Sequence, residues 1–262
     1  MSLWSRDQLR IALAPHGLAL LRHQGNPLKP VASKSIACDA RDWHNLLPLL
    51  ERELSEPAWR APQAHVVLSN QYVRYVLTAP PGKALTREEE HALASASFRE
   101  IYGNAVTDWR IRVYSQPPQF GLVGAAIDES LALLIGELFK RHHYPNWTLN
   151  PLASLASNHP VHPATDWWVL VEPGWMCLFN AAGNYWRYVS SQPVDDHWRS
   201  TLPDMLDREV RMAGDSPTDK IQTAFIQAVG VGHGTPPVAS GWNWRMGKQN
   251  NLEQGVLALA AA

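Results

Sequence analysis

The sequence predicts an α/β fold that occurs twice in the chain and forms two lobes with a cleft between them. The first observation is a strand–turn–strand pattern near the middle of the chain. Trp167 to Val171 is a continuous apolar run, as in a central strand, and Trp175 to Phe179 is a second one. Glu172-Pro173-Gly174 separates them as a turn. After the turn cluster at 181–184, Tyr185 to Val189 predicts a third strand.

The second observation is a shorter version of this pattern at the N-terminus. Leu9 to Leu13 and Leu18 to Leu21 are apolar and flank Ala14-Pro15-His16-Gly17, and Pro30 to Cys38 predicts a third strand. If the two units are equivalent, each is the first strand pair of its own sheet, and both turns lie at the mouth of one cleft. The third strand is then expected to run antiparallel to a first strand that pairs in parallel with later ones. The alternative is a single sheet that Trp167 to Val171 extends.

Composition excludes several classes of protein. The 262 residues carry a net charge of −1 and no basic block, which argues against non-specific nucleic-acid binding. No run of 18 apolar residues and no signal-peptide pattern occur, so we expect a cytoplasmic protein without a membrane span. Cys38 and Cys177 predict buried free thiols. A disulfide or a metal site is the alternative, although no Cys-x-x-Cys spacing supports it.

The remaining periodic segments predict helices and further strands. The sequence Thr86-Arg87-Glu88-Glu89 is a capping box at the start of a helix that continues to Tyr102. The apolar spacing of Ile221, Ala224, Phe225 and Ala228 predicts a helix over Thr218 to Val229. Other helices are expected over 43–54, 128–141 and 195–212, and other strands over 65–68, 73–77, 109–114, 120–126 and 147–149.

Five of these segments together resemble a known family. They are the N-terminal hairpin, the strand pair LSNQYVRYVLTAP, the helix FREIYG, the strand WRIRV and the hairpin WWVLVEPG. The pattern, over roughly residues 9–212, resembles the cytoplasmic actin-like family that includes the pilus protein PilM, the MshI proteins and the cytoplasmic part of the secretion protein GspL. The resemblance implies a duplicated ribonuclease-H-like fold of the actin-like ATPase superfamily. Residues 1–160 would be the N-terminal lobe with an inserted subdomain, and 161–262 the C-terminal lobe and tail.

The resemblance also implies a function. Members form a cytoplasmic scaffold or adaptor beneath an inner-membrane platform, in type IV pilus biogenesis or type II secretion, and act by protein–protein interaction. The expected partner is an inner-membrane pilus or secretion platform protein. An assembly ATPase and a second copy of the chain are further partners that the resemblance leaves open.

Some members of this family bind ATP and others have lost that capacity, so the two turns decide the expectation. ATP-binding members carry an Asp-x-Gly type sequence there, whose backbone N–H groups approach phosphates while the acid orients Mg²⁺. The first turn keeps Gly17 but has no acid, and Pro15 removes a backbone donor. The second turn has Glu172 and Gly174 at the right spacing, but Trp175 would crowd a phosphate.

We therefore interpret Gly17, Glu172 and Gly174 as vestigial phosphate turns, with neither ATP nor Mg²⁺ as cofactor. Glu172 can also be a solvated turn carboxylate, which is the simpler interpretation. The rival for the whole chain is a nucleotide-binding ATPase or kinase of the same superfamily. No Ser/His/Asp or Cys/His set indicates another catalytic site.

The resemblance implies a partner groove as well. The pilus member of the family captures a short N-terminal peptide of a membrane protein in a groove between its subdomains. We expect the corresponding groove near Ser69 to Leu77, with Tyr72 and Arg74 as partner-binding residues. No metal site is expected from the remaining polar features, which are His142-His143 at a helix end, His159 and His162 in a loop, the glycine-rich stretch 230–234, and a solvated charged face at Asp204, Asp207, Arg208 and Glu209.

Overall fold

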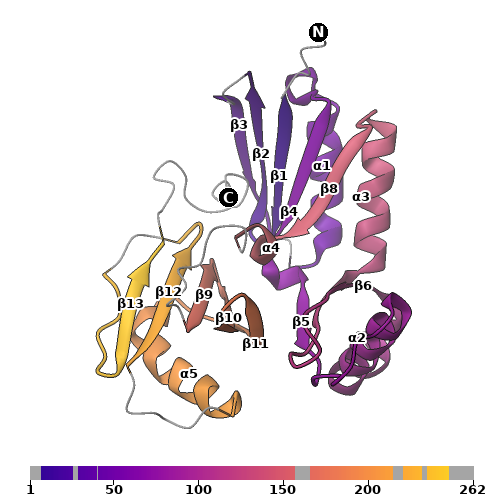
Figure 1. Ribbon diagram of the computed structural model, residues 1–262. Coiled ribbons are helices and arrows are strands. Elements are labelled where there is room, and N and C mark those ends of the chain that lie inside the picture. The colour runs from indigo at the N-terminus through magenta and orange to yellow at the C-terminus, as the bar shows by residue number, and fades with distance from the viewer. Residues whose placement is uncertain are drawn as a thin grey trace. The chain divides into compact units, whose positions relative to one another are not determined.

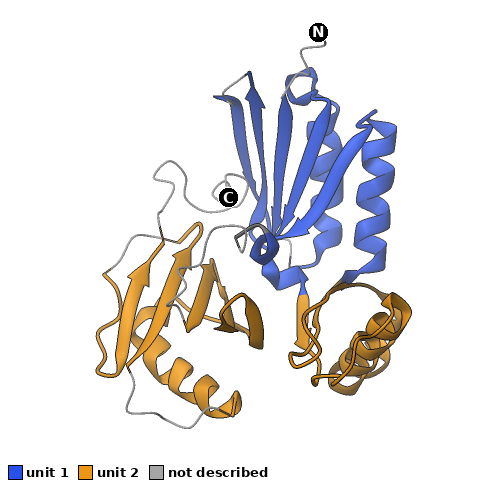
Figure 2. Cartoon of the chain, viewed as in Figure 1, with its two compact units in different colours: residues 1–73, 127–155, 250–262 blue, residues 74–126, 156–249 orange. Residues whose placement is uncertain are grey.

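The computed structural model describes residues 7–25, 29–39, 41–156, 166–214, 221–231 and 235–247. The chain forms two compact units (Figure 2). Unit 1 comprises residues 1–73, 127–155 and 250–262, and unit 2 comprises residues 74–126 and 156–249. Within the described residues, no helix is both long enough and apolar enough to span a membrane. The predictions for His159, His162, residues 232–234 and the tail 252–262 fall outside the described residues.

Unit 1 contains a five-stranded sheet with the order β3-β2-β1-β4-β8 (Figure 1). β1 is antiparallel to β2 and β2 to β3, whereas β1, β4 and β8 run parallel to one another. The strands are β1 (Gln8–Ala14), β2 (Gly17–Gln24), β3 (Lys29–Ala37), β4 (Gln63–Leu68) and β8 (Asn146–Pro151). The helical segments are η1 (Trp43–Asn45), α1 (Leu46–Leu54), η2 (Pro57–Trp59), η3 (Asn70–Tyr72), α3 (Glu129–Arg141) and α4 (Leu152–Ala156).

One face of this sheet packs against α1 and α3, which lie side by side in Figure 1. Leu9, Ile11 and Leu13 of β1 are fully buried, as expected for the face of a central strand that meets helices. Trp147 of β8 packs on Phe139 of α3, with ring centroids 5.3 Å apart. The apolar alternation of the sequence therefore sets which side of the sheet the helices cover.

Unit 2 contains a second five-stranded sheet with the order β11-β10-β9-β12-β13. β9, β10 and β11 are successively antiparallel, whereas β9, β12 and β13 run parallel. The elements are β9 (Trp167–Glu172), β10 (Trp175–Ala182), β11 (Tyr185–Pro193), α5 (Trp198–Met212), β12 (Gln222–Ala228) and β13 (Trp242–Met246). Trp167, Val169 and Val171 face a core that includes Trp198 and Leu202 of α5.

The other face of this second sheet carries aromatic side chains. The rings of Trp168 and Phe179 are stacked at 4.9 Å, and Trp186 lies 5.2 Å from Phe179. Tyr75 meets Phe179 edge-on at 6.1 Å. We call Tyr75, Trp168, Phe179 and Trp186 the aromatic cluster. It joins the second sheet to the small sheet in which Tyr75 lies.

This small sheet, with the order β5-β7-β6, lies in the inserted segment between η3 and α3. Its elements are β5 (Arg74–Leu77), α2 (Arg87–Tyr102), η4 (Gly103–Asp108), β6 (Trp109–Tyr114) and β7 (Val123–Asp128). The predicted capping box is confirmed, because the Thr86 side chain accepts from Glu89 N at 3.3 Å and the Glu89 carboxylate accepts from Thr86 N at 2.8 Å.

The predicted duplication is confirmed: the two hairpins lie in two separate sheets with the same strand order. The single-sheet alternative is wrong. The expected direction of the third strand is also wrong, because each hairpin reverses the chain. It is the second strand of each sheet that runs antiparallel to the first, and the third pairs with the second.

The helix predicted over Thr218 to Val229 is wrong, because Gln222–Ala228 is the strand β12. It lies between β9 and β13, where Ala224 and Ile226 are fully buried. Ile221, which the helical spacing would place in the core, is 63% exposed. Pairing with both neighbouring strands outweighs the local helical pattern here.

Candidate functional site

The two first hairpins correspond position by position in their hydrogen bonds. The Leu13 carbonyl accepts from Ser69 N at 2.9 Å, directly after β4, and the Val171 carbonyl accepts from Val229 N at 2.8 Å, directly after β12. Leu13 and Val171 are therefore equivalent positions. The turns then align as Ala14 with Glu172, Pro15 with Pro173, His16 with Gly174 and Gly17 with Trp175.

Local packing explains the residues of the first turn. Pro15 is buried and has no N–H group to offer a phosphate. The His16 carbonyl accepts a hydrogen bond from Cys38 N at 3.2 Å. A Cβ at Gly17 would lie 2.1 Å from the carbonyl oxygen of Ile36, and the φ of Gly17 is +143°. The strand β3 therefore requires glycine at position 17.

The second turn is a tight connection of two residues. Glu172 pairs with Trp175 across it, so Pro173 and Gly174 form the turn itself. Proline followed by a glycine with positive φ, here +76°, is typical of a type II turn. The Gly174 carbonyl accepts from Val194 N at 3.1 Å, as His16 does from Cys38 in the first turn. The backbone geometry of the turn therefore explains why glycine stands at position 174.

Glu172 is not a solvated turn carboxylate, and that expectation is wrong. Its side chain is only 1% exposed. Burial, and after it the negative charge of Glu172, raises the pKa of the Cys177 thiol in the same unit. Burial and the charges of Cys177 and Glu172 likewise raise the pKa of the Tyr75 phenol. Glu172 is thus a buried acid of the second turn, at the position that Ala14 occupies in the first.

Neither turn combines the features that phosphate binding needs. The first has alanine in the acid position and His16 where the second has Gly174. The second has the acid and this glycine, but Trp175 directly follows them. Gly17 belongs to unit 1, whereas Glu172 and Gly174 belong to unit 2. The cleft that the two turns were expected to share stays a prediction. Among the described residues, no group of three or more His, Cys, Asp or Glu could hold a metal ion.

The expected partner-binding residues lie at the connection between the units. Tyr72 ends η3 and is half-buried, and burial together with the charges of Cys38 and Asp42 raises the pKa of its phenol. Arg74 begins β5 and pairs with Ala126. The boundary between the two units falls between Tyr72 and Arg74. The structure places both in the connecting segment, and the groove stays a prediction.

The structure corrects two further expectations. Glu209 is 4% exposed and accepts from the Tyr188 hydroxyl at 2.6 Å, so this part of the charged face of α5 is not solvated. Cys38 is half-buried rather than buried, whereas Cys177 is buried, and both cysteines are free thiols. Burial raises the pKa of both thiols.

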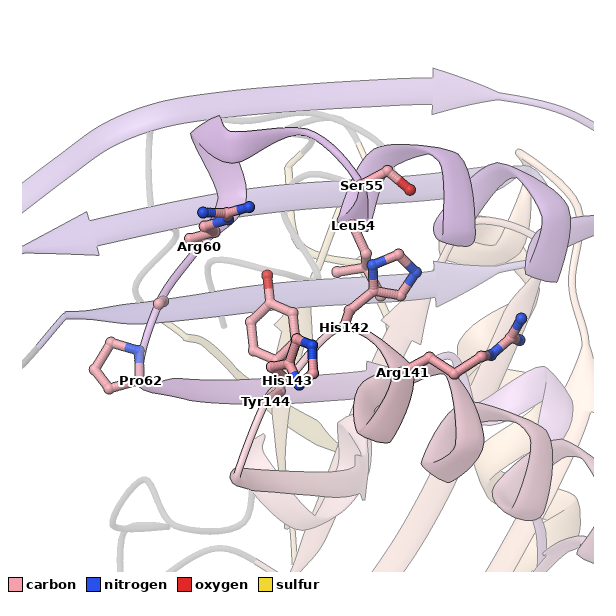
Figure 3. Close-up of a pocket in the computed structure, with 9 residues that line it drawn as sticks. Leu54, Ser55, Arg60, Pro62, Arg141, His142, His143 and Tyr144 are labelled. Carbon is pink, nitrogen blue, oxygen red and sulfur yellow. The ribbon is translucent and has the colours of Figure 1, made fainter.

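Sequence reasoning missed a hollow of about 530 Å³ in unit 1 (Figure 3). Its wall is formed by the end of α1, the linker 60–62 and residues 141–144, which are the last residue of α3 and the three that follow it. Figure 3 shows Tyr144 between Arg60 and His142, with Arg141 reaching away from them. The signal for it in the sequence is the basic run Arg141-His142-His143 at the end of a predicted helix.

Comparisons with known proteins show the fold. No family model and no curated protein matches the sequence. The cytoplasmic domain of EpsL, an inner membrane component of the type II secretion system of Vibrio cholerae, is similar with a TM-score of 0.62 at 15% identity, over 97% of this chain and 93% of that chain. The chain has the actin-like ATPase fold.

Two other solved structures share this fold. A Bacteroides thetaiotaomicron protein described as having an actin-like ATPase fold is similar with a TM-score of 0.56 at 10% identity, over 86% of this chain and 82% of that chain. A structure of the PilM-PilN type IV pilus biogenesis complex is similar with a TM-score of 0.56 at 15% identity, over 84% of this chain and 81% of that chain. The actin-like fold accounts for the two sheets of equal strand order described above.

Proposed function

We propose that the chain is a cytoplasmic scaffold or adaptor in the assembly of a type IV pilus or a type II secretion-like system. It acts by binding an inner-membrane platform or motor component. The observation that carries the proposal is the pair of incomplete phosphate turns. Ala14 stands in the acid position of the first turn, and Trp175 directly follows the glycine of the second, where its indole would crowd a phosphate. An actin-like fold without a complete nucleotide site is suited to holding partners rather than to hydrolysis.

The structural neighbours support this choice of process. One is named as an inner membrane component of a type II secretion system, and another is a complex of pilus biogenesis proteins. We propose that this chain associates with the inner membrane through such partners. An assembly ATPase and a second copy of the chain are further partners in this proposal. The two lobes would be residues 1–160, with the inserted subdomain, and 161–262.

The rival function is nucleotide binding by an ATPase or kinase of the same superfamily. One observation favours it: Glu172 and Gly174 keep the spacing of an acid and a glycine in the second turn. Two observations oppose it. Glu172 is buried to 1% exposure, and Pro15 leaves the first turn one N–H group short.

Site-specific photo-crosslinking in the native host tests the scaffold function. A photoreactive residue replaces Tyr72, and a control replaces Met212, which is 70% exposed at the end of α5. We expect the Tyr72 position to crosslink to an inner-membrane pilus or secretion platform protein and the Met212 position to do so far less. Absence of any platform protein among the crosslinked products, with the chain expressed and folded, contradicts the proposal.

A further inference from the structure

The hollow beside α3 carries positive charge that the protein itself does not neutralise. Arg141 pairs with Glu51 at 2.5 Å and is compensated. Arg60, His142 and His143 make no ion pair with any residue in the described part of the chain. None of the described residues that line the hollow is acidic. An anionic ligand would thus meet a guanidinium and two imidazoles with free donor capacity.

The helix ends at the hollow explain only some of its basic side chains. α1 and α3 both end at the hollow, and basic side chains offset the partial negative charge of their last carbonyl groups. Arg60 lies outside both helices, after η2, and it is exposed. Tyr144 is buried and donates to the Trp59 carbonyl at 2.8 Å, which fixes the wall between the two segments. The site is therefore held by tertiary contacts and is not only a helix end.

A second hollow of about 470 Å³ continues the first along the same two segments. It is lined by Gln63 to His65 and Pro145 to Thr148, which follow directly on the residues of the first hollow. The two segments lie side by side, because β4 and β8 pair from Gln63 with Asn146 onward. His65 is hydrogen-bonded to the Thr148 hydroxyl at 3.0 Å. No acidic residue lines this hollow in the described residues either.

We propose that these two hollows together bind an extended acidic segment of a protein partner. Their succession along two chain segments suits an elongated ligand. The uncompensated guanidinium of Arg60 and the imidazoles of His142 and His143 in the first hollow suit carboxylate side chains. A membrane surface fits less well, because lipid-binding clusters contain about 4–8 Lys or Arg, whereas the two hollows contain two Arg and no Lys. The proposal adds a partner chemistry to the scaffold function and rests on it.

Fluorescence anisotropy with a labelled peptide of alternating glutamate and alanine tests the proposal. We expect the parent chain to bind this peptide and not the matching lysine–alanine peptide. Arg60→Glu should weaken binding about tenfold, since it places a like charge against the ligand. Ser55→Trp, which fills the exposed rim without changing charge, should also weaken it.

The matched control is Arg112→Glu, which makes the same charge change at an exposed position of β6. We expect a change of about twofold or less, as for a screened surface charge. Unfolding temperatures equal to that of the parent show that the variants fold. Three results would each overturn the proposal. They are equal weakening by both charge reversals, no binding of the acidic peptide, and binding to phosphatidylglycerol vesicles that depends on Arg60. If the acidic-segment proposal fails but the Tyr72 position still crosslinks to a platform protein, the proposed scaffold function is unaffected.

Discussion

The two five-stranded sheets have the same order and strand directions but differ on the face away from their helices. Arg10 of β1 and Trp168 of β9 occupy equivalent positions. In unit 1 that face carries Arg10 and, paired with it on β4, His65. In unit 2 it carries the aromatic cluster, which joins the sheet to β5. Equivalent positions of the ladder therefore carry polar side chains in one unit and an aromatic junction in the other.

Other equivalent positions have stayed alike. The fifth strand of each sheet carries an Asn-Trp pair in the same register, at Asn146-Trp147 and Asn243-Trp244, with the two tryptophans opposite Ala64 and Ala224. The residues that face helices are apolar in both units. The comparison shows that the two units share their strand pairing and their apolar helix-facing side chains. Their turns and outer faces differ, and function can change there without a change of fold.

A buried acid on the covering helix gives a third comparison. Glu53 of α1 binds the Lys34 ammonium of β3 at 2.7 Å and is 1% exposed. Glu209 of α5 instead accepts from the Tyr188 hydroxyl of β11 and from Arg208. Both acids tie the third strand to the helix. Glu53 does so through an ion pair with a strand residue, and Glu209 through a hydrogen bond from a strand hydroxyl.

The largest expected effect is a difference in stability between alanine substitutions in the two turns. Gly17→Ala should lower the free energy of unfolding by about 3 kcal/mol, because its Cβ would collide with the Ile36 carbonyl and displace β3. Gly174→Ala should cost only about 1–2 kcal/mol, the price of a positive φ for alanine. Urea denaturation measures both. Equal losses would mean that the two glycines serve the same purpose, contrary to the comparison.

The next effect tests the ion pair of unit 1. Lys34→Met should cost about 2 kcal/mol at neutral pH, because it leaves the buried carboxylate of Glu53 without its ammonium partner. Burial alone would raise the pKa of Glu53. The hydrogen bond and charge of Lys34, with hydrogen bonds from Arg52 and Trp59, outweigh burial and lower it.

A lowered folded-state pKa has a definite consequence for acid stability. The stabilisation by Glu53 is present above its ordinary pKa of 4.5 and is lost as the pH falls through the lowered folded-state pKa. The parent should therefore lose stability in this acid range, and Lys34→Met should lose less. Thermal unfolding between pH 7 and pH 3 (roughly the range over which carboxylates titrate) checks this. Parallel curves for the two proteins would show that the pair does not contribute.

A smaller effect concerns the edge of the second sheet. The Gln116 amide accepts from Trp186 N at 2.6 Å and donates to Trp186 O at 3.1 Å, so it covers the edge strand β11. Gln116→Ala should cost about 1.5 kcal/mol and expose these groups. Gln116→Glu should cost at least as much, because it places a buried carboxylate oxygen against the carbonyl oxygens of Gly121 and Trp186. Hydrogen exchange at the Trp186 amide measures the loss directly, and unchanged protection in Gln116→Ala would contradict this function of the side chain.

Local signals in the sequence were sufficient for much of this fold. The capping box at Thr86 and Glu89 depends on residues three apart, and the hairpins depend on apolar runs around turn residues. The helical spacing of Ile221, Ala224 and Phe225 misled, because pairing with β9 and β13 is a tertiary effect that no local pattern contains.

The candidate site was less predictable for the same reason. Glu172 looked like a turn carboxylate, but its burial depends on how its unit folds around it. The spacing of turn residues could identify Gly17, yet only the position of Ile36 on β3 explains why glycine is required. The basic hollow needs the ends of two helices and the linker at Arg60 to come together in space, and these lie about 80 residues apart in the sequence.

Isothermal titration of the full chain with Mg-ATP tests the central claim most directly, namely that this actin-like fold has exchanged its nucleotide site for partner binding. Pro15, the missing acid at Ala14 and the indole of Trp175 predict no measurable binding heat. Affinity in the micromolar range or tighter, lost in Glu172→Ala but retained in Glu53→Gln, would contradict the account and favour a nucleotide-binding enzyme.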